Sequence, residues 1–227
     1  WKESATAGFD IVAYAGSGSQ QNISHSLSAV PETIFVKNRT DDHWWNVYHQ
    51  YIGNTKYLML NENEGTSTND NRWGSTTPTS SVFTVKTANE TNKSSSNHIA
   101  YCFAPKQGFS KFGYHKGNGN ADGTYIHLGF KAALIIFKNA DGAYDWQVNT
   151  NKTSTSGGTN VNDFYYAPNT ANAEGSSGTA QDLDFLANGV KFRGDGSQAN
   201  GGSVSYVYMA WAEAPFVNSK GVPCNAR

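Results

Sequence analysis

The chain has 227 residues, of which 15% are charged and 13% are aromatic, and its net charge is −1. A nearly neutral chain is not expected to bind nucleic acid, because phosphate neutralisation needs a strong basic excess. The low charge and the aromatic content also exclude a disordered, solvating chain. No apolar run reaches the roughly 18 residues that a membrane helix needs, so no membrane insertion is expected.

Short β-branched or aromatic runs, bounded by polar turns, predict strands along the whole chain. In chain order they are 9–15, 33–38, 44–49, 56–61, 81–86, 98–104, 109–115, 124–130, 132–138, 144–149, 163–167, 182–187, 189–194 and 203–212. No convincing helical period of adequate length accompanies them. We therefore expect an all-β fold, a jelly-roll β-sandwich of about 12–14 antiparallel strands.

The two halves of the chain align when the first is shifted by about 100 residues, which indicates an internal repeat. Gly16 and Gly18 fall on Gly117 and Gly119, and "IFVKN" (34–38) falls on "IIFKN" (135–139). Each half alone is too small to bury both faces of its sheet, so we expect one pseudo-symmetric domain with a shared core. Two independent domains are the alternative.

The expected organisation has three parts. Residues 1–7 are a lead-in or linker, residues 8–217 form the single sandwich with halves 8–107 and 108–217, and residues 218–227 are a tail. Cys102 lies in an apolar run and is expected to be a buried thiol, whereas Cys224 lies in the tail. Whether the two cysteines pair stays open, and the count fits folding in a reducing cytosol.

Patterns typical of catalytic sites are missing from the sequence. It holds neither a Gly-x-Ser-x-Gly elbow nor a phosphate-binding Gly-Lys-Ser/Thr loop, and its six histidines lack metal-ligand spacing. Asp182 with Asp184, and Glu62 with Glu64, alternate on possible strands, but neither pair has a third acid at the spacing of sandwich glucanases. We expect no enzymatic activity.

The segment "NGNADGT" resembles the start of a calcium loop, because Asn118, Asn120 and Asp122 alternate. The twelfth position is Gly129, where such a loop needs a bidentate Glu. A tight glycine turn is therefore favoured, with calcium as the weaker alternative and no other cofactor expected.

Aromatic side chains beside polar loop residues are candidates for sugar stacking. Trp44, Trp73, Tyr165 and Tyr166 lie beside polar residues in or near loops, and Asn, Asp and Gln are the types that bind sugar hydroxyls. Trp45 aligns with Trp146 in the repeat, which favours a core position for Trp45 and an outward one for Trp44. For each candidate, ordinary packing under a loop is the competing interpretation.

Several runs together resemble a domain of tailed-bacteriophage virion proteins, found near the C-terminal end of tail-fibre and related appendage proteins. They are "GFDIVAYAGSGSQQNISHSLSAVPETIFVKN", "PTSSVFTV", "IAYCFAPKQGFSKFGYHKGNGNADG", "LDFLANGVKFR" and "YVYMAWAEAPF", within residues 8–217. The resemblance implies a concanavalin A/laminin G-like jelly roll on the virion surface, assembled in the host cytoplasm. It implies other virion proteins as partners and a homo-oligomeric appendage. It brings no binding residues with it.

Three functions follow as hypotheses. The leading one is a non-enzymatic appendage domain that contributes to recognition of host-surface polysaccharide. The second is a purely structural decoration or assembly module of capsid or tail, without sugar binding. The third, a polysaccharide depolymerase, lacks a convincing carboxylate pair in the sequence.

Overall fold

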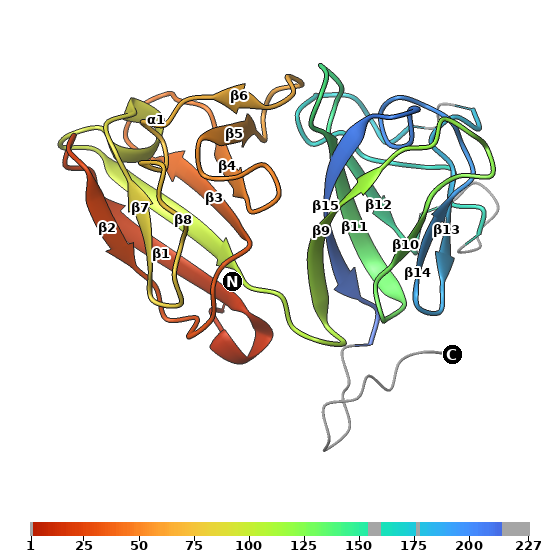
Figure 1. Cartoon of the computed structure of the whole chain (residues 1–227), viewed down its shortest axis with the longest axis horizontal. Helices are drawn as coiled ribbons and strands as arrows, with labels where there is room; N and C mark the ends of the chain where they lie inside the picture. The colour runs from red at the N-terminus through yellow and green to blue at the C-terminus, as the bar shows by residue number, and fades with distance from the viewer. Residues whose placement is uncertain (1, 154–159, 176–177, 215–227) are drawn as a thin grey trace. The chain divides into compact units, whose positions relative to one another are not determined.

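The computed structural model describes residues 2–153, 160–175 and 178–214 (Figure 1). The chain divides into two compact units, Trp1–Pro105 and Lys106–Arg227, each considered by itself below. The division falls two residues before the predicted boundary between the halves. Cys102 is buried in the first unit. The predicted tail 218–227, with Cys224, lies outside the described residues, so the pairing of the two cysteines stays open.

The first unit contains one large sheet and one small sheet, both antiparallel. The large sheet has the strand order β1-β8-β3-β4-β5-β6, and the small sheet pairs β2 with β7. The elements are η1 (Ala5–Ala7), β1 (Phe9–Ala15), β2 (Gln21–Ser24), β3 (Thr33–Asn38), β4 (Asn46–His49), β5 (Lys56–Met59), β6 (Ser67–Thr68), β7 (Val82–Val85), α1 (Asn89–Asn92) and β8 (Asn97–Phe103). Residues 4–7, expected as a lead-in, form a short 3-10 turn that bonds back to Phe9.

Alternation along the strands builds the core of this unit. Successive strand residues point to opposite faces, so Ile34 and Val36 of β3 share a face with Ala100 and Cys102 of β8. From the small sheet, Ile23, Phe83 and Val85 belong to the same buried cluster. The two sheets therefore enclose an apolar layer, which is the defining feature of a β-sandwich.

The second unit repeats this plan. Its large sheet has the order β12-β11-β15-β9, and its small sheet has the order β10-β14-β13. The strands are β9 (Ser110–Lys116), β10 (Tyr125–His127), β11 (Ala132–Asn139), β12 (Gln147–Thr150), β13 (Leu183–Leu186), β14 (Gly189–Phe192) and β15 (Ser205–Ala212). A separate buried cluster lies in this unit and includes Ile135, Phe137, Tyr208, Phe185 and Val190.

The two units match in strand topology and in register. Strands β1, β8, β3 and β4 correspond in order to β9, β15, β11 and β12, and the β2–β7 pair corresponds to β10–β14. Val36 pairs with Ala100, and Phe137, its counterpart in the repeat, pairs with Tyr208. The all-β sandwich prediction is thus confirmed, whereas the jelly-roll topology and a core shared between the halves remain predictions.

A buried asparagine closes the same corner in both units. Asn92 accepts the Ser17 N–H at 2.9 Å through Oδ1, and its Nδ2 donates to the Ser19 carbonyl at 2.6 Å. Asn200 likewise accepts the Asn118 N–H at 3.2 Å, and its Nδ2 donates to the Asn120 carbonyl at 3.0 Å. These amides satisfy backbone groups of the turn after the first strand, which buried polar groups require.

Some predicted elements differ from the structure. Segment 163–167 forms no strand and makes only single bridges, Tyr165 with Gly175 and Tyr166 with Val148. Segment 44–49 becomes a strand only at Asn46, because the Trp45 N–H bonds to the Asn61 side chain instead of a neighbouring strand. Strands β2 and β6 were not predicted. No helix in the described ranges is long and apolar enough to cross a membrane.

Candidate functional site

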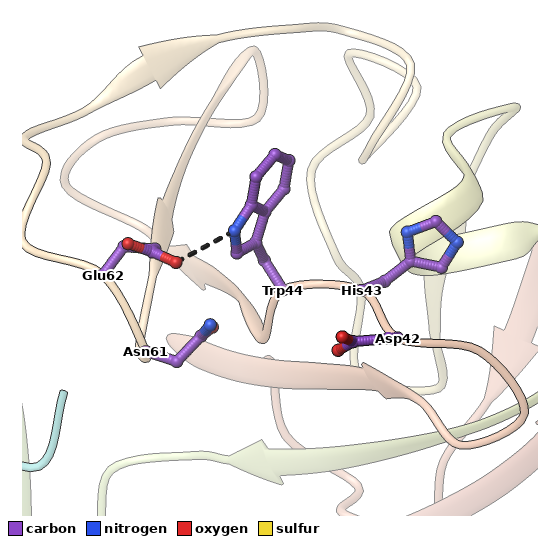
Figure 2. Close-up of a pocket in the computed structure, with 5 residues that line it drawn as sticks. All are labelled: Asp42, His43, Trp44, Asn61 and Glu62. Carbon is purple, nitrogen blue, oxygen red and sulfur yellow. Dashed lines mark hydrogen bonds between the residues drawn. The ribbon is translucent and has the colours of Figure 1, made fainter. Parts of the chain in front are cut away.

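A pocket of about 370 Å³ opens on the first unit around an exposed tryptophan (Figure 2). It is lined by Asp42, His43, Trp44, Asn61 and Glu62. The first three belong to the connection between β3 and β4, and the other two follow β5. Trp44 is 44% exposed, and its indole Nε1 donates to Oε1 of Glu62 at 3.0 Å. Trp44 thus faces outward, as the sequence predicts.

Hydrogen bonds fix the connection that carries Trp44. The side-chain oxygen of Asn38 accepts the backbone N–H groups of Thr40 at 2.9 Å and Asp41 at 3.0 Å. The Asp41 carboxylate contacts Lys93 Nζ at 2.8 Å and accepts the Ser96 hydroxyl at 2.6 Å. The Lys93 hydrogen bond, assisted by that from Ser96, lowers the pKa of Asp41 to about 2. The first turn of the connection is therefore anchored, and the next three residues project from it.

The opposite wall is anchored by Asn61, whose Oδ1 accepts the Trp45 N–H at 2.8 Å. Figure 2 shows Asn61 and Glu62 on one side of the indole and Asp42 and His43 on the other. An exposed aromatic face can stack on the apolar face of a sugar ring, while carboxylates and amides hold its hydroxyl groups. The pocket therefore combines an exposed aromatic face with polar side chains.

Trp73 lies elsewhere, in the core of the first unit, so its interpretation as an exposed stacking residue is wrong. It is 2% exposed, its Nε1 donates to the Lys56 carbonyl at 3.0 Å, and its ring packs edge-on to Tyr48 at 5.8 Å. The polar tract around it folds back in a turn closed by the Gly74 N–H and the Asp70 carbonyl at 2.8 Å. This turn carries Trp73 beneath the loop, which is the competing interpretation stated above.

Tyr165 and Tyr166 belong to the second unit. Tyr165 is half-buried, while Tyr166 is 39% exposed and its N–H bonds to the Val148 carbonyl at 2.9 Å. The single bridges on either side of the pair hold it against β12 and Gly175. A ligand role for these two residues stays a prediction.

The calcium-loop candidate forms a self-bonded turn. Asn118 Oδ1 accepts the Asn120 N–H at 3.1 Å and the Asn200 amide at 3.0 Å, and Asn120 Oδ1 accepts the Asp122 N–H at 2.8 Å. The Asp122 carboxylate contacts Lys191 Nζ at 2.7 Å. These oxygens already have protein partners, which supports the glycine-turn interpretation. Across the part of the chain that the structure describes, no group of three His, Cys, Asp or Glu side chains could hold a metal ion.

The second unit keeps the frame of the Trp44 pocket but not its aromatic wall. The Trp146 N–H bonds to Asn169 Oδ1 at 2.9 Å, as Trp45 does to Asn61. In the repeat, however, Asp145 stands where Trp44 stands, and it accepts the Asn169 amide at 2.7 Å. The exposed indole is thus a property of the first unit alone. Asp42, His43 and Asn61 were missed from the sequence, and Glu62 was considered only as an acid beside Glu64, although the unmatched Trp44 in the repeat was a usable signal.

Comparison with known proteins matches the chain to a family model. Residues 2–215 match the model of a domain of unknown function, DUF7483. No curated protein and no solved structure matches the chain. Because the match spans nearly the whole sequence, the chain belongs to the DUF7483 domain family.

Proposed function

We propose that this domain is a non-enzymatic surface domain of a bacteriophage virion appendage that contributes to recognition of host-surface glycan. The observation that carries the binding role is the exposed indole of Trp44, which Glu62 orients at the mouth of a pocket lined by polar side chains. The virion setting is supported by the resemblance of residues 8–217 to tail-fibre-type appendage proteins. Other virion proteins and host polysaccharide are the partners that this proposal implies.

Binding at one such pocket is expected to be weak. The pocket is open and small, so it contacts one or two sugar rings rather than a long chain. In an oligomeric appendage, several copies would engage one polysaccharide, and avidity would raise the overall affinity about 10²-fold or more. Firm attachment would then come from copy number.

The test is glycan binding by the isolated chain and by variants of the pocket. Trp44→Ala removes the stacking face, and Glu62→Gln keeps the shape but removes the charge. Tyr125→Ala is the matched control, because Tyr125 is 42% exposed but lies on β10 of the second unit. We expect saturable binding to host polysaccharide that Trp44→Ala abolishes and Tyr125→Ala leaves unchanged.

Three results would contradict the proposal. Equal glycan binding by wild type and Trp44→Ala would reject the pocket. Absence of glycan binding, together with a whole-particle structure in which Trp44 is covered by another virion protein, would favour the purely structural role. Release of new reducing ends from the polysaccharide would instead show a depolymerase.

A further inference from the structure

A second hollow, of about 230 Å³, lies on the first unit. It is lined by Ala13, Tyr14 and Ala15 of β1, Asn97 and His98 of β8, and Arg39. Arg39 follows β3 directly, so the β3–β4 connection contributes to this hollow at its start and to the Trp44 pocket at its end.

Strand register determines which side chains are available to a ligand. Ala15 pairs with Asn97, and the Arg39 N–H bonds to the Asn97 carbonyl at 2.7 Å, so the three residues lie side by side. Tyr14 and His98 alternate with these positions and stack on each other at 5.2 Å. Their polar atoms already face the carbonyls of Thr91, Ser96 and Asn89. The polar groups of the hollow that are available to a ligand are therefore the Arg39 guanidinium and the Asn97 side-chain amide.

The guanidinium of Arg39 is exposed, and the ion pairs found among the described residues use other side chains. Its closest acidic neighbour in sequence, Asp41, is held by Lys93. Burial lowers the pKa of His98, which disfavours a positive charge on its ring. The hollow therefore presents one fixed positive charge, from Arg39, above a floor of alanine methyl groups.

The second unit shows that the fold does not require this hollow. At the positions of Ala13 and Ala15 the repeat has Tyr114 and Lys116, and at the position of Arg39 it has Ala140. The strands pair in the same register around these residues. The same strand register therefore accommodates a bulkier surface without a guanidinium.

We propose that the Arg39 hollow binds the acidic group of a glycan, either the carboxylate of a uronic acid or a sulfate ester. The planar guanidinium fork matches both anions with paired hydrogen bonds. The alanine methyl groups would contact the C–H face of the sugar, and the Asn97 amide would bind a hydroxyl. The volume is below the 300–1,000 Å³ or so of drug-sized ligand pockets, so it suits one sugar ring.

This inference goes beyond the proposed function, because the Trp44 pocket contributes Asp42 and Glu62, which disfavour an anion. The two sites would bind different groups of a polysaccharide. The Trp44 pocket would bind hydroxyl groups, and the Arg39 hollow would bind a negatively charged group. Either site could exist without the other, so their tests are separate.

The experiment is titration of the full chain, followed by amide NMR, with three probes: glucuronate, glucose 6-sulfate and uncharged methyl glucoside. Arg39→Gln removes the guanidinium, and Ala13→Tyr fills the hollow with the residue that the second unit carries. Lys116→Gln is the matched control, since it removes one exposed positive charge at the position equivalent to Ala15. Thermal unfolding verifies that each variant is folded.

We expect glucuronate or glucose 6-sulfate to shift amide signals around Arg39 and Asn97, and methyl glucoside not to do so. Arg39→Gln should weaken this binding about tenfold or more, because hydrogen bonds to a charged group are lost. Ala13→Tyr should weaken it similarly, and Lys116→Gln should leave it unchanged. Binding of neither anion, or equal binding by Arg39→Gln and wild type, would overturn the inference whatever the outcome at Trp44.

Discussion

The imidazole of His115 lies almost parallel to the ring of Tyr206, with ring centroids 4.8 Å apart and planes inclined by 12°. In the first unit the same two positions hold Tyr14 and His98, at 5.2 Å and 14°. His115 Nε2 lies 2.9 Å from the Ala199 carbonyl, and the Tyr14 hydroxyl donates to the Thr91 carbonyl at 2.6 Å. The site thus retains a stacked Tyr–His pair with its order reversed.

Exchange of the pair should therefore be tolerated where single substitutions are not. His115→Tyr and Tyr206→His alone should each lower the free energy of unfolding by about 2 kcal/mol, through overpacking or a cavity. The double exchange should recover at least about 1 kcal/mol of the summed loss, because the two sites are in contact. Urea unfolding of the four proteins measures this coupling. Simple additivity would show that the pair is not a unit.

Acid should destabilise the chain through its buried histidines. Burial lowers the pKa of His115 to about 4, although the Ala199 hydrogen bond acts in the opposite direction, and burial also lowers the pKa of His98. An unfolded histidine has a pKa of about 6.5, so between about pH 6.5 and pH 4 only the unfolded chain gains the proton. Stability is therefore fully present above this range and is lost as the pH falls through it.

At about pH 5 the titration of His115 should lower the free energy of unfolding by about 2 kcal/mol relative to neutral pH. Urea midpoints across this range measure it. His115→Phe should reduce the pH dependence, whereas His127→Gln should retain it, because His127 is exposed. An unchanged pH dependence in His115→Phe would contradict the assignment.

Removal of the Asn200 amide should open the corner of the second unit. Its Nδ2 donates to Asn118 Oδ1 at 3.0 Å and to the carbonyls of Asn120 at 3.0 Å and Gly194 at 2.8 Å. Asn200→Ala leaves these acceptors without their donor, so we expect the free energy of unfolding to fall by about 2–4 kcal/mol. Asn172→Ala, at an exposed position, should cost less than about 0.5 kcal/mol. Chemical unfolding compares the two, and similar losses would refute a special role for Asn200.

The two tryptophans of the first unit should separate binding from stability. Trp73→Ala creates a cavity in the core and should cost about 3–5 kcal/mol. Trp44→Ala removes a ring that is 44% exposed, so its cost should stay near 1 kcal/mol or below. Calorimetric unfolding tests both values. A large loss for Trp44→Ala would assign the indole to packing.

Strand positions were predictable wherever β-branched and aromatic residues alternate between polar turns, as in 33–38 and 203–212. Prediction failed in two other segments. The short strand 21–24 carries only one large apolar residue, Ile23, so its sequence resembles a loop. Segment 163–167 is aromatic enough for a strand, yet only isolated backbone bridges form there.

The candidate site was predictable only in part, for a similar reason. Exposed and buried aromatic residues can have similar neighbours in sequence. Trp44 follows Asp-Asp-His and Trp73 follows Asp-Asn-Arg, so both come after polar residues. Burial of Trp73 depends on a turn that folds back over Tyr48, which is a tertiary contact that local patterns do not encode. Comparison of the two halves distinguishes better, because Trp44 has Asp145 as its counterpart.

The duplicated frame has a practical consequence. The second unit reproduces the register, the asparagine corner and the stacked pair of the first, while it lacks the indole of Trp44 and the guanidinium of Arg39. Each molecule therefore contains its own reference. When a sugar shifts amide NMR signals around Trp44 or Arg39, the equivalent amides around Asp145 or Ala140 can be compared in the same sample and at the same sugar concentration.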